Sequence, residues 1–184
     1  MIIHTGGAIG TDMLFEYAGL FYGHQVKAFS FEGHETKSHC RIILEDYELK
    51  KAHKMVLNAR GDRHFPTKNA YTNNLIYRDY YIVKDATFIV AIGYMEGKTL
   101  KSVSGGTYWG VNLTNKPTLF FNLNTNSWFP DVDIAQYIKQ YIRLDRCGIK
   151  EAIMAGIGTR NIKFHETKVR EVIMFVMKIL EECE

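Results

Sequence analysis

Two glycine-rich segments stand near opposite ends of the chain, and each follows a short apolar run. Thr5-Gly6-Gly7-Ala8-Ile9-Gly10-Thr11-Asp12 follows Met1-Ile2-Ile3, and Ala155-Gly156-Ile157-Gly158-Thr159-Arg160 follows Ala152-Ile153-Met154. Each leads into residues with helical apolar spacing, so each predicts a strand, a glycine turn and a helix. Glycine lets a backbone approach a phosphate closely, and a helix N-terminus presents N–H groups to an anion. The two segments therefore predict a site for a phosphorylated ligand.

The rest of the chain alternates between predicted strands and helices. Strands are expected at 25–31, 86–92, 117–123 and 149–155, and helices at 12–22, 45–59, 71–83, 108–113, 134–143 and 165–180. The run from Ala86 to Ile92 is continuously apolar, which is typical of a central parallel strand. This order predicts an α/β fold, a doubly wound, mainly parallel and Rossmann-like sheet. Because no linker interrupts the 184 residues, we expect a single domain over 1–184.

Composition excludes several classes of protein. No apolar run approaches the roughly 20 residues of a membrane span, and the chain opens with a strand rather than a signal peptide, so no membrane partner is expected. The three cysteines, Cys40, Cys147 and Cys183, are far apart and lack CxxC spacing, which favours reduced thiols and a cytoplasmic location. A net charge of +3 permits an anionic ligand, but it falls short of the basic surface of a dedicated nucleic-acid binder.

Four motifs lie in this context of strands and helices. They are TGGAIGTD at 5–12, NNLIYRD at 73–79 before VKDATFIVAIG, SGGT at 104–107 before KPTLFFNL, and AGIGTR at 155–160. Together they resemble the Smf/DprA–LOG (SLOG) superfamily of Rossmann-like nucleotide-binding proteins. In typical relatives the unit ending in a G-[ST]-R-like turn comes first, whereas here it comes last. The chain therefore resembles a circular permutant, in which joining Glu184 to Met1 would restore the family order.

The resemblance implies that the glycine turns meet in one crevice at the carboxyl ends of the strands. Arg160 would offer a phosphate its fork of donors. Independently of the resemblance, Tyr108 and Trp109 stand next to a glycine turn, and we expect this aromatic pair to stack on a base. Asp12 is either a ligand contact or a helix N-cap. Arg78 is either a ligand contact or half of a surface ion pair with Asp79 or Asp85. The implied ligand-binding residues are Thr5, Gly6, Gly7, Gly10, Thr11, Asp12, Arg78, Gly105, Gly106, Thr107, Tyr108, Trp109, Gly158, Thr159 and Arg160.

A basic stretch adds to this prediction. From Lys50 to Lys68 there are six Lys and Arg residues against one Asp. These charges are either ordinary solvated surface or a basic rim over a phosphate-bearing ligand.

Catalysis has no clear place in the sequence. The LOG phosphoribohydrolases carry a PGGxGTxxE turn whose Glu serves cleavage of the N-glycosidic bond, whereas this chain has SGGTYWGVN. A nucleoside 5'-monophosphate N-glycosidase would need another carboxylate, and Glu16, Glu32 and Glu35 are the candidates because they border the predicted crevice. Each is also typical of an ordinary surface position. His24, His34 and His39 match no compact metal motif, so neither a metal nor a cofactor is expected.

The sequence is compatible with two functions. The intact glycine turns without the catalytic Glu favour a protein that binds a nucleotide or nucleotide-derived small molecule for sensing or sequestration. The alternative is a nucleotide-processing hydrolase of the N-glycosidase type. Binding of single-stranded DNA is disfavoured because no continuous basic groove is apparent. The apolar, aromatic-rich composition also predicts a homo-oligomer.

Overall fold

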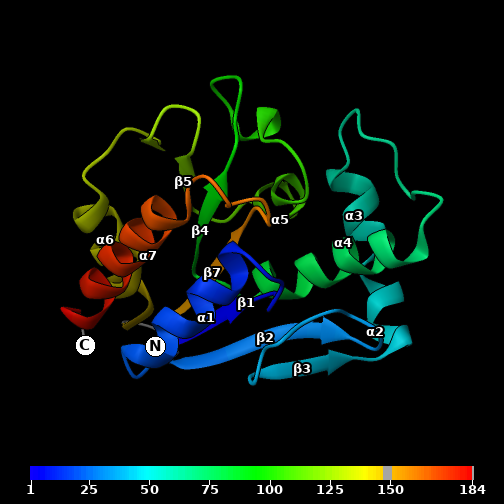
Figure 1. Ribbon diagram of the computed structural model, residues 1–184, viewed down its shortest axis with the longest axis horizontal. Helices are drawn as coiled ribbons and strands as arrows, with labels where there is room; N and C mark the ends of the chain where they lie inside the picture. Colours follow the sequence, from blue (N-terminus) through cyan, green and yellow to red (C-terminus); the bar gives the residue numbers. More distant parts are fainter. Residues whose placement is uncertain (147–150, 184) are drawn as a thin grey trace.

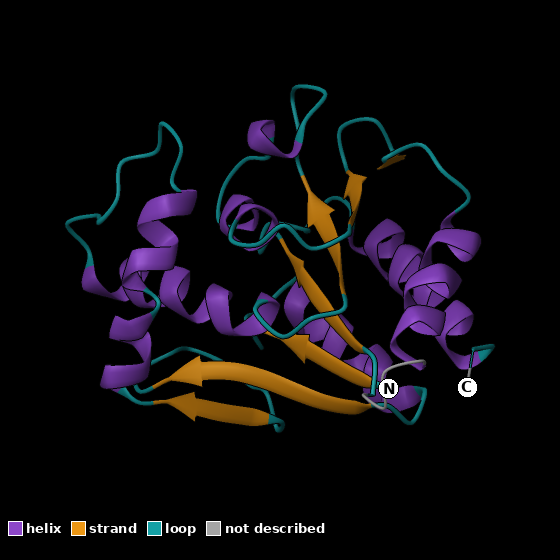
Figure 2. Ribbon diagram, turned by 180° about the vertical axis from the view of Figure 1, so that it is seen from behind, coloured by secondary structure: helices purple, strands orange, loops and turns teal. Residues whose placement is uncertain are grey.

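The computed structural model describes residues 1–146 and 151–183. Its strands form one seven-stranded sheet in the order β3-β2-β1-β7-β4-β5-β6 (Figures 1 and 2). The strands are β1 (Ile2–Thr5), β2 (Gln25–Phe31), β3 (Arg41–Leu44), β4 (Phe88–Gly93), β5 (Thr118–Asn122), β6 (Ser127–Phe129) and β7 (Ile153–Gly158). Neighbouring strands are parallel, except that β6 runs antiparallel to β5.

Helices cover both faces of this sheet. They are α1 (Thr11–Phe21), α2 (Asp46–Lys51), α3 (His53–Ala59), α4 (Ala70–Val83), α5 (Thr107–Asn112), α6 (Ile134–Arg146) and α7 (Glu166–Glu181), with a 3₁₀ turn at Leu100–Ser102. One hydrophobic cluster joins α1, α6 and α7 to the sheet, and a second joins α2 to α5 to the opposite face. The prediction of a doubly wound, Rossmann-like α/β fold is confirmed.

The central strand β4 shows why its sequence is continuously apolar. Phe88, Val90 and Ile92 belong to one cluster, whereas Ile89 and Ala91 belong to the other. All of them are fully buried. A strand covered on both faces has no solvated side, so its sequence lacks the alternation of a half-exposed strand.

Several predicted elements differ from the observed ones. β3 and β6 were not predicted; β3 is a short edge strand whose Ile42 and Ile43 are exposed, so no buried face marks it in the sequence. The helix predicted at 45–59 is divided at Ala52, whose N–H donates to the Leu49 carbonyl in the tighter i to i−3 pattern that ends α2. The strand predicted at 149–155 is described only from 151 onward and begins at Ile153; residues 149 and 150 lie outside the described residues, as does Cys147.

The last glycine motif is a strand where a turn was predicted. Residues 155–158 lie in β7, which pairs with both β1 and β4. Close packing requires glycine here, because a Cβ on Gly156 would lie 2.5 Å from the Phe15 ring and one on Gly158 would lie 2.4 Å from Thr11. The prediction of a glycine turn at 155–158 was therefore wrong, and the chain leaves the strand only at Thr159.

Candidate functional site

A cavity lies where the chain leaves neighbouring strands toward opposite faces of the sheet. β1 leads into α1 on one face and β4 leads toward α5 on the other, with β7 between them. The cavity measures about 690 Å³. Open α/β sheets hold their ligands at such a switch point, and small-molecule sites commonly measure roughly 300–1,000 Å³.

The cavity wall draws on every segment that the motifs singled out, together with α4 and the loop before it. Its residues are Ala8, Asp12, Arg63, His64, Thr67, Thr72, Leu75, Ile76, Arg78, Asp79, Gly105, Gly106, Thr107, Trp109, Gly110, Ile157, Gly158, Thr159, Arg160 and Asn161. The structure thus brings together the second glycine turn and the residues that follow β7. From the first motif, it places only Ala8 and Asp12 in the wall.

The first glycine turn is filled by the protein's own atoms. A Cβ on Gly6 would lie 1.2 Å from Nη1 of Arg78, and one on Gly10 would lie 2.8 Å from backbone beyond β7. The Thr36 hydroxyl donates to the carbonyl of Gly7. At these three glycines, the space that a side chain would occupy is taken by other atoms of the protein. None of the three lines the cavity.

The second glycine turn is open. A Cβ on Gly105 or Gly106 would meet no heavy atom within 4 Å, and both residues are exposed. Gly105 also has a positive φ of 64°, a backbone conformation that residues with a side chain rarely adopt. Its backbone is therefore accessible to a molecule in the cavity.

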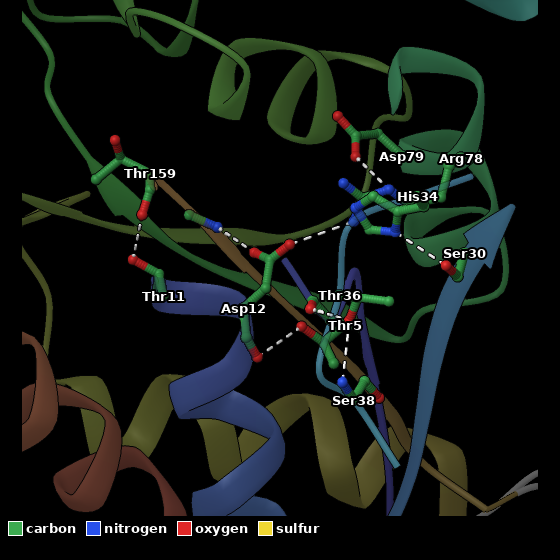
Figure 3. Close-up of polar contacts among 12 residues, drawn as sticks. Thr5, Thr11, Asp12, Ser30, His34, Thr36, Ser38, Arg78, Asp79 and Thr159 are labelled. Carbon is green, nitrogen blue, oxygen red and sulfur yellow. Dashed lines mark hydrogen bonds and ion pairs between the residues drawn. The ribbon is translucent and has the colours of Figure 1, made fainter. Parts of the chain in front are cut away.

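Thr5 and Thr11 hold the frame around the cavity rather than lining it. The Thr5 hydroxyl donates to the Asp12 carbonyl at 3.0 Å, and the Thr11 hydroxyl donates to the Thr159 carbonyl at 2.8 Å (Figure 3). Both residues are fully buried. The first bond ties β1 to the start of α1, and the second ties the start of α1 to the residue that follows β7.

Asp12 is a buried link between three elements. The N-cap residue of α1 is Gly10, which has no side chain to cap the helix. The interpretation of Asp12 as the N-cap was therefore wrong. Instead, its Oδ2 accepts from Nη1 of Arg78 at 3.2 Å and its Oδ1 accepts from the N–H of Gly158 at 3.2 Å (Figure 3). Asp12 therefore joins α1 to α4 and β7 at the cavity wall.

Arg78 is held between two carboxyl groups. Its side chain is 4% exposed, and its Nε lies 3.5 Å from Oδ1 of Asp79, so it is no surface ion pair. Asp85, the other predicted partner, pairs with Lys84 at 3.3 Å. Burial raises the pKa of Asp79 to about 7 and also raises the pKa of Asp12, although Arg78 opposes both shifts. Burial therefore favours the protonated form of Asp79 more than in an exposed carboxyl group, while Arg78 favours the ionised form.

Tyr108 and Trp109 face different surroundings. Trp109 lines the cavity and packs on Phe65, with ring centroids 5.4 Å apart. The Tyr108 hydroxyl donates toward the carbonyls of Ala59 and Arg60 at 3.1 and 3.2 Å, and its ring is absent from the cavity wall. Of this pair, the structure brings only Trp109 to the cavity.

The three carboxylates considered for catalysis lie away from the cavity. Glu32 and Glu35 are exposed in the loop after β2. Glu16 is 1% exposed, and its Oε1 accepts from the N–H of His39 at 3.1 Å. The carboxyl groups that line the cavity are those of Asp12 and Asp79.

Several residues of the cavity wall were not among the ligand-binding residues expected from the sequence, including Arg63, His64 and Asp79. The basic stretch before α4 was a signal for Arg63, which is the one member of that stretch's six cations to reach the wall. Its Nη2 donates to the Val103 carbonyl at 2.7 Å, and its guanidinium lies 3.9 Å from the Tyr108 ring centroid. Asp79 carried no signal of its own beyond its place beside Arg78.

The three histidines considered for metal binding do not come together in one site. His34 is buried, with Nδ1 2.9 Å from the Ser30 hydroxyl (Figure 3), and burial lowers its pKa to about 3. Across residues 1–146 and 151–183, no three His, Cys, Asp or Glu side chains gather so as to hold a metal ion. No helix in these same ranges is long and apolar enough to cross a bilayer.

Comparison with known proteins gives one structural likeness. The sequence matches no protein family and no curated protein. Its fold is similar to the crystal structure of a candidate molybdenum carrier protein from Syntrophus aciditrophicus SB, with 14% sequence identity and a TM-score of 0.47. The match covers 97% of this chain and 92% of that one. A likeness at this level does not extend to ligand or activity.

Proposed function

We propose that this protein binds a nucleotide, or a nucleotide-derived phosphorylated small molecule, for sensing or sequestration. The observation that carries the proposal is the cavity wall, in which Arg63 and Arg160 stand with Trp109 beside the open turn at Gly105 and Gly106. A guanidinium offers a phosphate a planar fork of donors, and an indole offers an apolar face to a base.

The charges of the wall support an anionic ligand. Arg78 is balanced by Asp12 and Asp79. By contrast, Arg63 and Arg160 have no carboxylate within 4 Å in the part of the chain that the structure describes. Two guanidinium groups that line one cavity without a direct ion-pair partner are available to a phosphate.

The test is native mass spectrometry of the purified protein, followed by denaturing extraction and identification of any bound molecule. We expect an intact nucleotide or a phosphorylated derivative of one. Isothermal titration with nucleoside mono- and diphosphates measures the affinity directly. Absence of a co-purified ligand together with no binding of any nucleotide would reject the proposal.

An N-glycosidase is the second candidate, and Asp79 is the observation that favours it. Its carboxyl group lines the cavity, and its pKa of about 7 suits a group that gives a proton to a leaving base near neutral pH. The candidate is tested by assaying release of free base from a nucleoside monophosphate.

We further propose that the chain is a circularly permuted member of the SLOG superfamily. β1 lies beside β7 in parallel, and Met1 and Cys183 pack against the same hydrophobic cluster. Both ends of the chain lie on the same side of the molecule (Figure 1). This arrangement supports α7 as the crossover between β7 and β1 in the usual order. A variant that joins Glu184 to Met1 through a short Gly-Ser linker and opens the chain before β7 should retain the fold; failure to fold would argue against the permutation.

Self-association is proposed from the surface of α1 and α7. These helices pack together, and Tyr17, Phe21 and Phe175 are exposed on them, with Phe21 at 77%. Exposed apolar patches mark many protein interfaces. Light scattering after size exclusion should show an oligomer that Phe21→Glu dissociates; a monomeric wild type would reject this proposal.

A further inference from the structure

Helix α4 runs along the cavity, and its cavity-facing residues change in character from one end to the other. Thr72, Leu75, Ile76 and Asp79 line the wall. Spacings of three and four place these residues on one face of the helix. Because an α-helix rises 1.5 Å per residue, Thr72 and Asp79 are about 10 Å apart along the axis. The cavity therefore offers different surroundings to the two ends of a ligand.

Two arginines without a direct ion-pair partner in the described ranges reach the cavity wall from different elements. Arg160 follows β7, and its charge contributes to the pKa of Asp79, so the two groups are within electrostatic range at the carboxyl end of α4. Arg63 and His64 come from the loop between α3 and α4. This loop is joined to the amino end of α4, because the N–H of Thr67 donates to Oδ1 of Asn73 at 2.8 Å. Between Thr72 and Asp79, α4 contributes the apolar side chains of Leu75 and Ile76, and Trp109 and Ile157 add further apolar surface to the wall.

The position of Arg63 is fixed by neutral partners. Nη2 donates to the Val103 carbonyl at 2.7 Å, and Nη1 donates more weakly to the Gly105 carbonyl at 3.4 Å. These carbonyls orient the guanidinium without neutralising it. Arg63 thus keeps its positive charge beside the open glycine turn, whereas Arg160 belongs to the segment that follows β7.

We propose that the ligand carries two separate anionic groups, one bound by Arg160 and the other by Arg63 with His64, with its apolar part over Leu75 and Trp109. Among nucleotides, this chemistry belongs to nucleoside bisphosphates whose phosphates stand on different ribose carbons. The inference rests on the proposed nucleotide-binding function and specifies the substrate class of the same cavity.

The test compares adenosine 3',5'-bisphosphate with ADP by isothermal titration calorimetry. ADP carries two phosphates on one ribose carbon, so it controls for the number of phosphates. We expect the 3',5'-bisphosphate to bind about tenfold tighter than ADP, since it alone reaches both arginines with separate phosphates. 5'-AMP and 3'-AMP show which phosphate each end of the cavity accepts.

The variants assign the second anion site. Arg63→Ala should remove the tenfold preference and leave the affinity for one of the two monophosphates unchanged. Arg63→Gln is the second variant, in case Arg63→Ala fails to fold without the hydrogen bonds to the Val103 and Gly105 carbonyls. Glutamine keeps hydrogen-bond donors but lacks the charge, so this variant should also lose the tenfold preference. Arg60→Ala removes an exposed cation that does not line the cavity, and it should change nothing.

The outcomes separate this inference from the function on which it rests. Equal affinity of the wild type for adenosine 3',5'-bisphosphate and ADP, or equal loss of both in Arg63→Ala, would overturn the two-anion assignment and leave nucleotide binding in place. Failure of all four nucleotides to bind would overturn both.

Discussion

Asp12 and Arg78 are 66 positions apart in the chain, yet Oδ2 of one lies 3.2 Å from Nη1 of the other in a buried ion pair. The second carboxylate oxygen of Asp12 accepts from the N–H of Gly158. This single side chain therefore connects α1, α4 and β7, the elements that carry much of the cavity wall. Its geometry predicts a large structural role.

Asp12→Ala should destabilise the fold by roughly 3–5 kcal/mol, because it leaves the Arg78 charge buried without this partner. Chemical denaturation measures the free energy of unfolding. Asp85→Ala is the matched control: Asp85 pairs with Lys84 at the surface, so its loss should cost less than about 1 kcal/mol. Similar losses in the two variants would show that the buried pair has no special weight.

The two glycine turns should respond oppositely to substitution. Gly6→Ala places a Cβ against the Arg78 guanidinium and should lower the free energy of unfolding, because the ion pair between Arg78 and Asp12 must shift. Gly106→Val adds a side chain where no heavy atom lies within 4 Å, so it should fold normally and lose nucleotide affinity. Thermal unfolding and calorimetry measure the two effects. Unchanged affinity in folded Gly106→Val would remove this turn from the binding site.

Sequence patterns identified the fold because burial leaves a direct trace in them. The apolar run of β4 is typical of a strand covered on both faces. The carboxyl ends of parallel strands meet at one edge of the sheet, and the cavity lies at that edge. β3 escaped prediction because its exposed Ile42 and Ile43 give an edge strand no buried pattern.

The glycine motifs show what sequence cannot decide. A missing side chain looks the same in sequence whether a phosphate or a protein atom fills the space. At Gly6 the atom is from Arg78, and at Gly156 it is from Phe15. Both contacts join residues far apart in the chain, so only the tertiary structure distinguishes these glycines from Gly106. The misplacement of Glu16 has a similar cause, since the loop carrying His39 covers it.

The raised pKa of Asp79 predicts a specific pH dependence of stability. Its folded pKa is about 7 against an ordinary value of 3.8, so between these pH values the native state keeps a proton that the unfolded chain has released. The contribution of Asp79 to stability therefore falls as pH rises from about 4 to about 7. Relative to wild type, Asp79→Asn should gain stability between pH 4 and pH 8. A constant difference in the free energy of unfolding across that range would contradict the shifted pKa.

Arg160 should anchor a phosphate by charge and by geometry. Arg160→Ala should weaken nucleotide binding by ~2–3 kcal/mol, and Arg160→Lys should restore only part of the loss, because an ammonium group cannot reproduce the guanidinium fork. Since the side chain is exposed and has no ion-pair partner in the described ranges, both variants should unfold at the wild-type temperature. Full affinity in Arg160→Ala would place the phosphate elsewhere in the cavity.

Four carboxyl variants decide between binding and hydrolysis. Glu16→Gln, Glu32→Gln and Glu35→Gln should leave nucleotide affinity intact, because these side chains lie outside the cavity wall. The decisive variant is Asp79→Asn, since it removes the acidic proton from a group that lines the wall while nearly preserving its shape. Under the binding function, wild type and all four variants release no free base from a nucleoside monophosphate. If the wild type releases base and Asp79→Asn stops that release without losing affinity, the protein is a hydrolase with Asp79 as its acid, because an anchoring residue would change binding instead.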